Sequence, residues 1–328
     1  MDLSIIIPVY NSETTINSCL VSIAKQKTQY SFEVIAVDDG STDNSLDILK
    51  DLKKKYQWLH VISQANSKQA EARNNGLQNS SGDFVTFIDA DDLLSEKYIQ
   101  QMIKPLKLTQ QFKWSICGIR KCWPQREVVE RESIFKNATL KSQIDLTGLF
   151  LNRNNEMDAG LWNKIYSTEI IRKNGLTFKN ENFYEDTLFN LEYFLSISPD
   201  EIYTTTEVLY TLNRIGKSTT TTYDKNMDIL SDNFLKIAEH LVMEHFSDQK
   251  RTSVIIDTLQ VRLTIHKIHY HLVTDINWTS KDTKRIVKKN LFFSKLINEY
   301  DLSVKYKISC LMLIAFPKLY GKMYLEHR

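Results

Sequence analysis

Glycine, proline and cysteine are scarce in this chain, which has only 9, 5 and 4 of them among 328 residues. So little glycine and proline disfavours a turn-rich all-β fold and favours long helices. The cysteines lie far apart except for Cys117 and Cys122, which lack the second pair or nearby histidine of a zinc site. Few cysteines in a long chain also fit a reducing cytoplasm.

A strong net charge is lacking too: the formal value is +2, so nucleic acid is not an expected partner. No apolar stretch reaches the roughly 18–20 residues that cross a bilayer. The apolar run at the N-terminus stops at Pro8, which is typical of a strand and not of a signal peptide. We therefore expect a cytoplasmic protein. The 15 Tyr and 15 Phe can build a large core.

Short apolar runs alternate with helical patterns in the first half of the chain. The apolar runs predict buried strands at residues 3–9, 32–37, 59–62, 83–88 and 114–119. The patterns between them predict helices at 13–25, 41–56, 68–78 and 95–108, the last with Ser95 as its N-cap. This alternation predicts an α/β fold with right-handed crossovers and a mostly parallel sheet flanked by helices.

The second half of the chain is different. The segment 126–181 is irregular and is expected to form loops over the sheet, and 201–212 reads as a late strand. Beyond residue 225 the pattern predicts helices at 227–245, 253–273 and 281–300. Three histidines, His266, His269 and His271, fall in one of these helices, where a surface or interface role is expected and not a metal site.

Polar or acidic residues follow three of the predicted strands. Tyr10 and Asn11 end the first, the sequence Asp-Asp-Gly-Ser at 38–41 ends the second, and Asp-Ala-Asp-Asp at 89–92 ends the fourth. Ligands bind beyond the carboxyl ends of strands in open parallel sheets, so these tips should converge on one pocket. Carboxylates so close together repel one another unless a cation lies among them. Mg²⁺ or Mn²⁺, which prefer carboxylate and phosphate oxygens, fit such a site. A simple helix-capping role for 89–92 is the alternative.

Four segments in register resemble the inverting family-2 glycosyltransferases, which have the GT-A fold, a Rossmann-like sheet flanked by helices. The segments are Ile5–Asn11, Val37–Asp43, Ala72–Leu77 and Phe87–Asp92. The resemblance continues more loosely at 161–164, 184–189 and 210–220, and beyond Tyr223 there is no specific match. It implies a catalytic domain at 1–223, with a donor-binding half at 1–120 and an acceptor half at 121–223, followed by a helical region at 224–328.

The same resemblance assigns residues to the nucleotide of a UDP-sugar. Pro8 and Tyr10 would flank the base, Asp39 would accept a hydrogen bond from its imide, and Asp89 and Asp91 would serve the metal and ribose, with Asp91 as the direct ligand. The remaining donor contacts it implies are Asn11, Asp38, Arg73 and Ala90. For the residues at the end of the second strand, the alternative is that Ser41 and Asp43 cap the next helix. For Arg73, the alternative is a solvated side chain on the surface of its helix.

The resemblance also implies a catalytic base. An acceptor hydroxyl needs a base to take its proton, and the family supplies an acidic residue from a motif that Glu185-Asp186 matches, with Asp186 as the base. The alternative is that these acids only favour the dipole at the start of their helix. Trp162, Asn163 and Glu185 would border the sugar or acceptor. The implied reaction moves a hexose (Glc, Gal or an N-acetylhexosamine) from UDP to a hydroxyl of a lipid-linked or protein-linked glycan.

Other functions are less consistent with the motifs. A nucleotide-sugar pyrophosphorylase or a dinucleotide-dependent oxidoreductase needs a glycine-rich loop after the first strand, which here reads Pro-Val-Tyr-Asn-Ser. A catalytically silent homologue acting as a partner protein is the remaining alternative, although the acidic residues are intact. In the tail, residues 276–328 hold 11 Lys/Arg against 4 Asp/Glu around the apolar run 308–316. Three roles are open for this tail: a homodimer contact, a peripheral contact with the inner face of the cell membrane, or packing within the chain.

Overall fold

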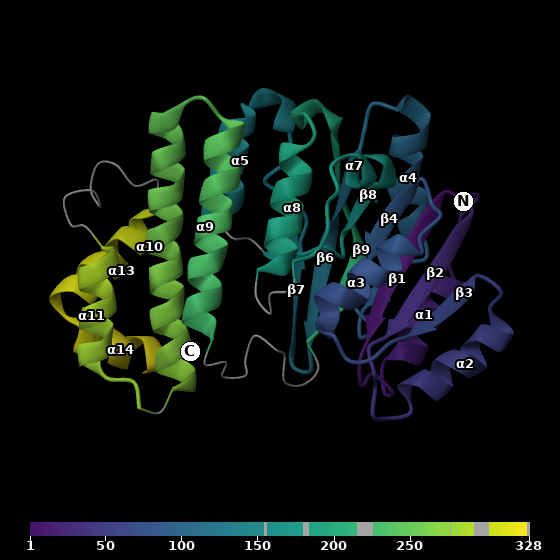
Figure 1. The fold of residues 1–328 in the computed structure, drawn as a ribbon, viewed down its shortest axis with the longest axis horizontal. Coiled ribbons are helices and arrows are strands. Elements are labelled where there is room, and N and C mark those ends of the chain that lie inside the picture. Colours follow the sequence, from purple (N-terminus) through teal and green to yellow (C-terminus); the bar gives the residue numbers. More distant parts are fainter. Residues whose placement is uncertain (154–155, 180–183, 215–225, 276, 292–301, 327–328) are drawn as a thin grey trace. The chain divides into compact units, whose positions relative to one another are not determined.

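The structure is a computed structural model that describes residues 1–153, 156–179, 184–214, 226–275, 277–291 and 302–326 (Figure 1). The chain divides into two compact units. The first comprises Met1–Leu146 and Asn155–Gly216, and the second Thr147–Asn154 and Lys217–Arg328. The strands lie in the first unit, and the long C-terminal helices lie in the second.

Strands and helices alternate at the start of the first unit, as the sequence predicts. The elements are β1 (Leu3–Val9), α1 (Ile16–Ala24), β2 (Phe32–Asp38), α2 (Ser45–Lys55), β3 (Leu59–Ser63), α3 (Lys68–Gln78) and β4 (Phe84–Phe87). β1 pairs in parallel with β2 and β4, and β2 pairs in parallel with β3. Every residue of β1 is buried, as a strand covered on both faces requires.

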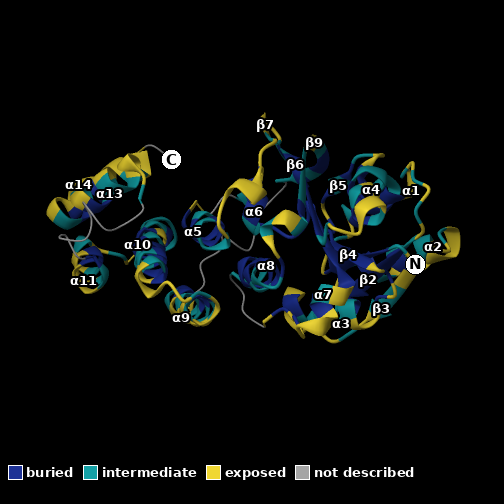
Figure 2. Ribbon diagram, turned by 90° about the horizontal axis from the view of Figure 1, so that it is seen from above, coloured by how far each residue is buried: buried dark blue, intermediate teal, exposed yellow. Residues whose placement is uncertain are grey.

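The rest of the first unit extends this sheet. Its elements are β5 (Leu93–Leu94), α4 (Tyr98–Thr109), β6 (Trp114–Trp123), β7 (Arg126–Glu130), η1 (Ala138–Leu140), α6 (Glu156–Ala159), β8 (Lys164–Ser167), α7 (Thr168–Lys173), α8 (Glu185–Leu195), η2 (Pro199–Glu201) and β9 (Ile202–Asn213). Helix α5 (Gln143–Arg153) begins in the first unit and belongs to the second from Thr147 on. Within the described residues the strand order is β3-β2-β1-β4-β8-β6-β9-β5, with β7 paired to β6. Helices α1 and α4 cover one face of the sheet, and α3, α7 and α8 the other (Figure 2).

Two sequence expectations are wrong here. The stretch 126–181 does not simply loop over the sheet: it contains β8, which lies between β4 and β6 and runs antiparallel to both. A strand of four residues is too short for its periodicity to stand out. Ser95 is not the N-cap of α4, whose N-cap is Lys97. The preceding residues form β5, and the Ser95 amide donates to the Leu209 carbonyl beside it.

Aromatic side chains fill the space between the sheet and α8. Trp114 of β6 has no exposed surface, and its ring lies 5.9 Å from that of Tyr166 and 5.6 Å from that of Tyr193. Phe87 of β4 packs edge-on against Phe178 and Phe189, with centroids 5.0 and 5.6 Å away. This core fixes the start of α8 close to the end of β4.

The second unit is helical in its described residues. Its helices are α9 (Met227–His245), α10 (Gln249–Thr274), α11 (Ser280–Asn290), α13 (Val304–Ala315) and α14 (Pro317–Glu326). α9 has its predicted bounds, and α10 starts earlier because Asp248 caps it by accepting from the Arg251 amide. The third predicted helix ends at Asn290, and residues 292–301 lie outside the described part. No described helix has the length and apolar character needed to cross a bilayer.

The close contact of α3 with β1 generates a stability prediction. A Cβ at Gly76 would overlap the Ile6 side chain of β1. Replacing glycine with alanine in an exposed helix normally gains about 0.5–1 kcal/mol, but we expect Gly76→Ala to lose about 1–3 kcal/mol through overpacking. Unfolding in urea, followed by circular dichroism, measures this change. The exposed Gln78→Ala in the same helix should be nearly neutral, and a stabilised Gly76→Ala would show that the interface is loose.

Candidate active site

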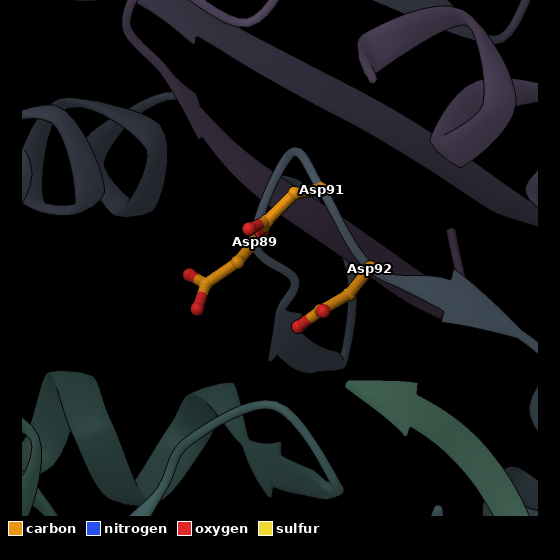
Figure 3. Close-up of side chains that lie close together, drawn as sticks. All are labelled: Asp89, Asp91 and Asp92. Carbon is orange, nitrogen blue, oxygen red and sulfur yellow. The ribbon is translucent and has the colours of Figure 1, made fainter. Parts of the chain in front are cut away.

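Three aspartates project from the turn that joins β4 to β5 (Figure 3). A carboxylate oxygen from each of Asp89, Asp91 and Asp92 lies within 4.8 Å of the other two. The turn is closed by the Asp92 amide, which donates to the Asp89 carbonyl at 3.1 Å, while the Ile88 amide still pairs with Ile6 of β1. The end of a buried parallel strand therefore presents a cluster of hard oxygen ligands.

The three carboxylates have different surroundings. Asp92 is buried, and its two oxygens accept from the Tyr210 hydroxyl and the Asn213 amide, each at 2.8 Å. Burial and the charges of Asp89 and Asp91 raise its pKa well above the usual value. Asp92 thus attaches the turn to β9. Asp91 is exposed at the tip, and reduced hydration together with the charge of Asp89 raises its pKa.

Asp89 is shared between the turn and α3. Its Oδ1 accepts from Gln69 Nε2 at 3.1 Å and from Arg73 NH2 at 3.3 Å, which leaves Oδ2 for another ligand. Because both oxygens of Asp92 are already occupied, Asp89 and Asp91 are the pair that fits a divalent cation. This is the pair that the sequence assigns to the metal; the role itself stays a prediction.

Arg73 connects this turn to α8. Its side chain is only 2% exposed, and NH1 donates to Asp186 Oδ1 at 2.8 Å and lies 3.7 Å from Glu185 Oε1. The guanidinium also lies over the Phe178 ring, 5.4 Å from its centroid. Burial would lower the Arg73 pKa, but the charges of Asp186, Asp89 and Glu185 raise it overall. The alternative of a solvated helix arginine is therefore wrong.

The residues beside Arg73 bond α3 to two other segments, the one that contains Phe178 and the one that follows β3. Asn74 Nδ2 donates to the Phe178 carbonyl at 2.9 Å, and Asn74 Oδ1 accepts from the Phe178 amide at 2.8 Å. Asn75 Nδ2 donates to Gln64 Oε1 at 2.7 Å. The motif at 72–77 thus supplies a cation, two amide contacts and the glycine that packs on β1.

Glu185 and Asp186 begin α8, so the favourable dipole position holds for both. Burial and the charge of Asp186 raise the pKa of Glu185 to about 7, against the lowering effect of Arg73. Burial also raises the pKa of Asp186, although Arg73 opposes this shift. A raised pKa suits a proton acceptor near neutral pH, and only the folded chain brings Asp186 next to the strand-end cluster.

The ends of β1 and β2 form a second side of the site. Asn11 Oδ1 accepts from the Thr42 amide at 2.8 Å, which ties the two tips together. Asp39 Oδ1 accepts from Gln64 Nε2 and the Ser67 amide, both at 2.8 Å, so Oδ2 is left for a ligand. Gly40 has φ +70°, and a Cβ there would lie 2.8 Å from the Asn66 amide nitrogen, so glycine alone fits.

The remaining predicted contacts at this side differ in exposure. Tyr10 is half exposed, at 50%, and can offer its ring to a ligand, whereas Pro8 lies in the buried strand. Asp38 is buried and its Oδ1 has no hydrogen-bond partner among the described residues. Neither residue of the capping alternative is the N-cap of α2, which is Asn44, although Asp43 Oδ1 accepts from the Ser45 amide in the first turn. Ser41 instead accepts from the Asn11 amide.

Trp162 and Asn163, which are predicted to contact the sugar or the acceptor, are more deeply buried than Tyr10. Trp162 stacks on Tyr210, with ring centroids 5.3 Å apart, and so lies behind Asp92. Asn163 has no exposed surface: its Nδ2 donates to the Cys117 carbonyl and its Oδ1 accepts from Lys164. The structure therefore does not bring Asn163 to the open side of the site. Ala90 is likewise buried in the turn.

Several residues of this site carried no role in the sequence analysis. Gln64, Gln69 and Tyr210 position Asp39, Asp89 and Asp92. Lys164 is fully buried and donates to the Met157 and Gly160 carbonyls at 2.7 and 2.5 Å. Desolvation lowers its pKa to about 7. Nothing in the local pattern distinguishes these polar residues, because their partners are distant in sequence.

Comparison with known proteins decides the family. The model of the family described as "Glycosyl transferase family 2" matches residues 4–172, which is more than half of the chain. The chain belongs to glycosyl transferase family 2. Among its relatives is the "Uncharacterized glycosyltransferase YibD" of Escherichia coli K12, 30% identical over 59% of this chain and 56% of the relative. A poly(ribitol-phosphate) beta-glucosyltransferase of Bacillus spizizenii is 44% identical over 30% of this chain and 16% of its own length. The chain thus matches about half or less of these relatives.

Solved structures confirm the GT-A fold of this family-2 chain. Staphylococcus aureus TarS 1–349 in complex with UDP-GlcNAc matches with a TM-score of 0.72 and 20% identity, covering 100% of this chain and 93% of TarS. The mannosyltransferase PcManGT of Pyrobaculum calidifontis, in complex with GDP-Man and Mn²⁺, matches with a TM-score of 0.50 and 15% identity, covering 96% and 87%. The expected α/β fold is confirmed.

The raised pKa of Glu185 predicts a pH effect on the stability of this family-2 chain. The pKa of Glu185 is about 7 in the folded state, so the carboxyl keeps its proton up to about pH 7, whereas in the unfolded state it loses the proton near its ordinary pKa of 4.5. Stability should therefore fall as pH rises across this window. Glu185→Gln cannot ionise, so its stability should fall less, by on the order of 1–3 kcal/mol. Thermal melts at several pH values measure this difference, and parallel curves for both proteins would contradict it.

Proposed function

We propose that this chain transfers a hexose from a UDP-sugar to an acceptor hydroxyl of a growing glycan, with inversion at the anomeric carbon. One observation carries the proposal: Arg73 bonds both Asp89, at the strand-end cluster, and Asp186, at the start of α8. Carboxylates suited to the cation of a nucleotide diphosphate and a carboxylate suited to a proton thus lie on either side of one guanidinium.

The nucleotide would bind between the tips of β1 and β2. Tyr10 offers an exposed ring for stacking on the base, and Asp39 Oδ2 can accept from an imide N–H, which uracil has. Gln64 and the Ser67 amide hold the other oxygen of Asp39, so this acceptor is fixed before the base arrives. Support for UDP comes from TarS, whose structure is a complex with UDP-GlcNAc.

Asp91 and Asp89 would hold the divalent cation, Mn²⁺ or Mg²⁺. Their oxygens lie within reach of one another, and PcManGT, which shares the fold, is a complex with Mn²⁺. Such an ion, when bound, neutralises the negative charge that builds up on a leaving diphosphate. Asp92 contributes indirectly, because its bonds to Tyr210 and Asn213 keep the turn in place.

Asp186 would take the proton of the acceptor hydroxyl. Its Oδ1 is bonded to Arg73, so Oδ2 is the oxygen that can accept this proton. The hydroxyl oxygen then attacks the anomeric carbon from the side opposite UDP, forms the new glycosidic bond, and expels UDP with the electrons of the old bond. This single displacement inverts the configuration. Glu185, with its raised pKa, stands beside Asp186 and is available to the acceptor.

The acceptor is proposed to be a sugar or polyol hydroxyl of a surface polymer, lipid-linked or protein-linked. The support is the relative named as a poly(ribitol-phosphate) beta-glucosyltransferase. On the open side of Asp91, Arg214 contributes positive charge and is itself paired with Glu156. A phosphate-bearing acceptor or donor would find a cation there.

The activity can be tested with a panel of UDP-sugars and a glycan acceptor, by following UDP release with and without Mn²⁺. We expect Asp91→Ala and Asp186→Asn each to lower kcat/KM by roughly 10²-fold or more, because each removes a group that acts in the transition state. Asp47→Asn on the exposed side of α2 is the matched control and should retain full activity. Full activity of both site variants would refute the assignment.

Tyr10 provides a separate test of the nucleotide site. Loss of a stacking ring should weaken UDP binding by roughly 1–3 kcal/mol, so Tyr10→Ala should raise the Kd for UDP about 5-fold to 150-fold. Tyr10→Phe keeps the ring and should bind nearly as well as the original chain. Calorimetric titration with UDP measures both variants, and an unchanged Kd for Tyr10→Ala would place the base elsewhere.

A further inference from the structure

Helix α13 is apolar on two opposite faces. Its inner face, represented by Cys310 and Leu313, packs into the core of the second unit with Val261 and Val287. A helix that buries one stripe normally carries polar residues on the opposite side. The outer face of α13 departs from this rule.

The outer face carries a continuous apolar stripe. Val304, Ile308, Leu311 and Ala315 are spaced by four, three and four residues, which aligns them along one side of the helix. Val304 is 73% exposed and Ile308 52% exposed. Further exposed apolar side chains follow at Phe316, between the two helices, and at Leu319 and Met323 of α14. Figure 2 colours much of both helices as exposed.

Lysines surround this α13–α14 face. Lys305 and Lys307 lie on either side of the stripe, since each is offset by about 100° per residue from its neighbours in the helix. Lys318 and Lys322 stand one turn apart on the exposed side of α14. The one carboxylate side chain among residues 302–326 is Glu326, at the end, 3.7 Å from Lys322. Both helices of this face therefore combine exposed apolar side chains with neighbouring lysines.

We infer that the α13–α14 face docks on an anionic lipid surface. Apolar side chains enter the boundary between headgroups and acyl chains, while lysine stems lie along it and their ammonium groups meet lipid phosphates. A second copy of the chain fits less well, because a twofold contact through α14 would bring Lys318 and Lys322 of one copy against the same lysines of the other. The inference goes beyond the proposed transfer reaction, and it can be tested without a donor or acceptor.

The test uses the full chain and co-sedimentation with phosphatidylcholine vesicles, with and without phosphatidylglycerol. We expect binding only to the anionic vesicles, and weaker binding at high salt because the charges are screened. Lys318→Glu with Lys322→Glu should weaken it by more than roughly tenfold. Ile308→Gln with Leu311→Gln should weaken it at low salt as well, since the apolar contribution does not depend on screening.

Two control variants test whether a loss of vesicle binding is specific to the α13–α14 face. Lys53→Glu with Lys55→Glu on α2 makes the same charge change elsewhere, and Ile229→Gln removes an apolar side chain that is 60% exposed on α9. Both should bind vesicles as the original chain does, and thermal melts should show that all variants are folded. No binding by the original chain, equal binding to neutral vesicles, or equal loss in the controls would overturn the inference. So would a dimer that the α13–α14 variants dissociate without any vesicle binding.

Discussion

The buried Arg73 side chain is the constraint on which the site depends. A guanidinium that is 2% exposed is stable only if carboxylates surround it, and here Asp89, Glu185 and Asp186 do so. These acids come from two segments separated by about a hundred residues of chain. Their like charges would otherwise push α8 away from the end of β4. The positive charge of Arg73 therefore allows a carboxylate-rich site to exist in the folded chain before any ligand binds.

Some carboxylate oxygens of the site are bonded within the protein, and others are left for a ligand. Asp92 uses both oxygens to hold the turn on β9, and Asp89 uses one oxygen for α3 and keeps the other. Asp91 stays at the exposed tip, where a ligand can reach it. Asp39 repeats this division at the next strand, with one oxygen bonded within the protein and one left over. In Asp39 and Asp89, fixing one carboxylate oxygen orients the other without filling the site.

The sequence predicted what depends on local pattern and failed where distant partners decide. The buried strands and α3 follow from apolar runs and periodicity, and the parallel strand ends placed Asp39 and Asp91 at one edge. β8 was missed because four residues carry little signal and its pairing with β4 and β6 is set by tertiary contacts. The burial of Arg73 and of Asn163 could not be read from their neighbours. Both depend on packing of segments that meet only in the fold.

We propose that the strand-end carboxylates and Asp186 form one site around Arg73. A crystal structure of the chain with UDP-GlcNAc and Mn²⁺ tests this most directly, since anomalous scattering locates the ion. We expect an ion coordinated by Asp91 or Asp89, with the sugar's anomeric carbon on the side facing Asp186. An ion and nucleotide bound away from this turn, or a sugar turned away from Asp186, would contradict it.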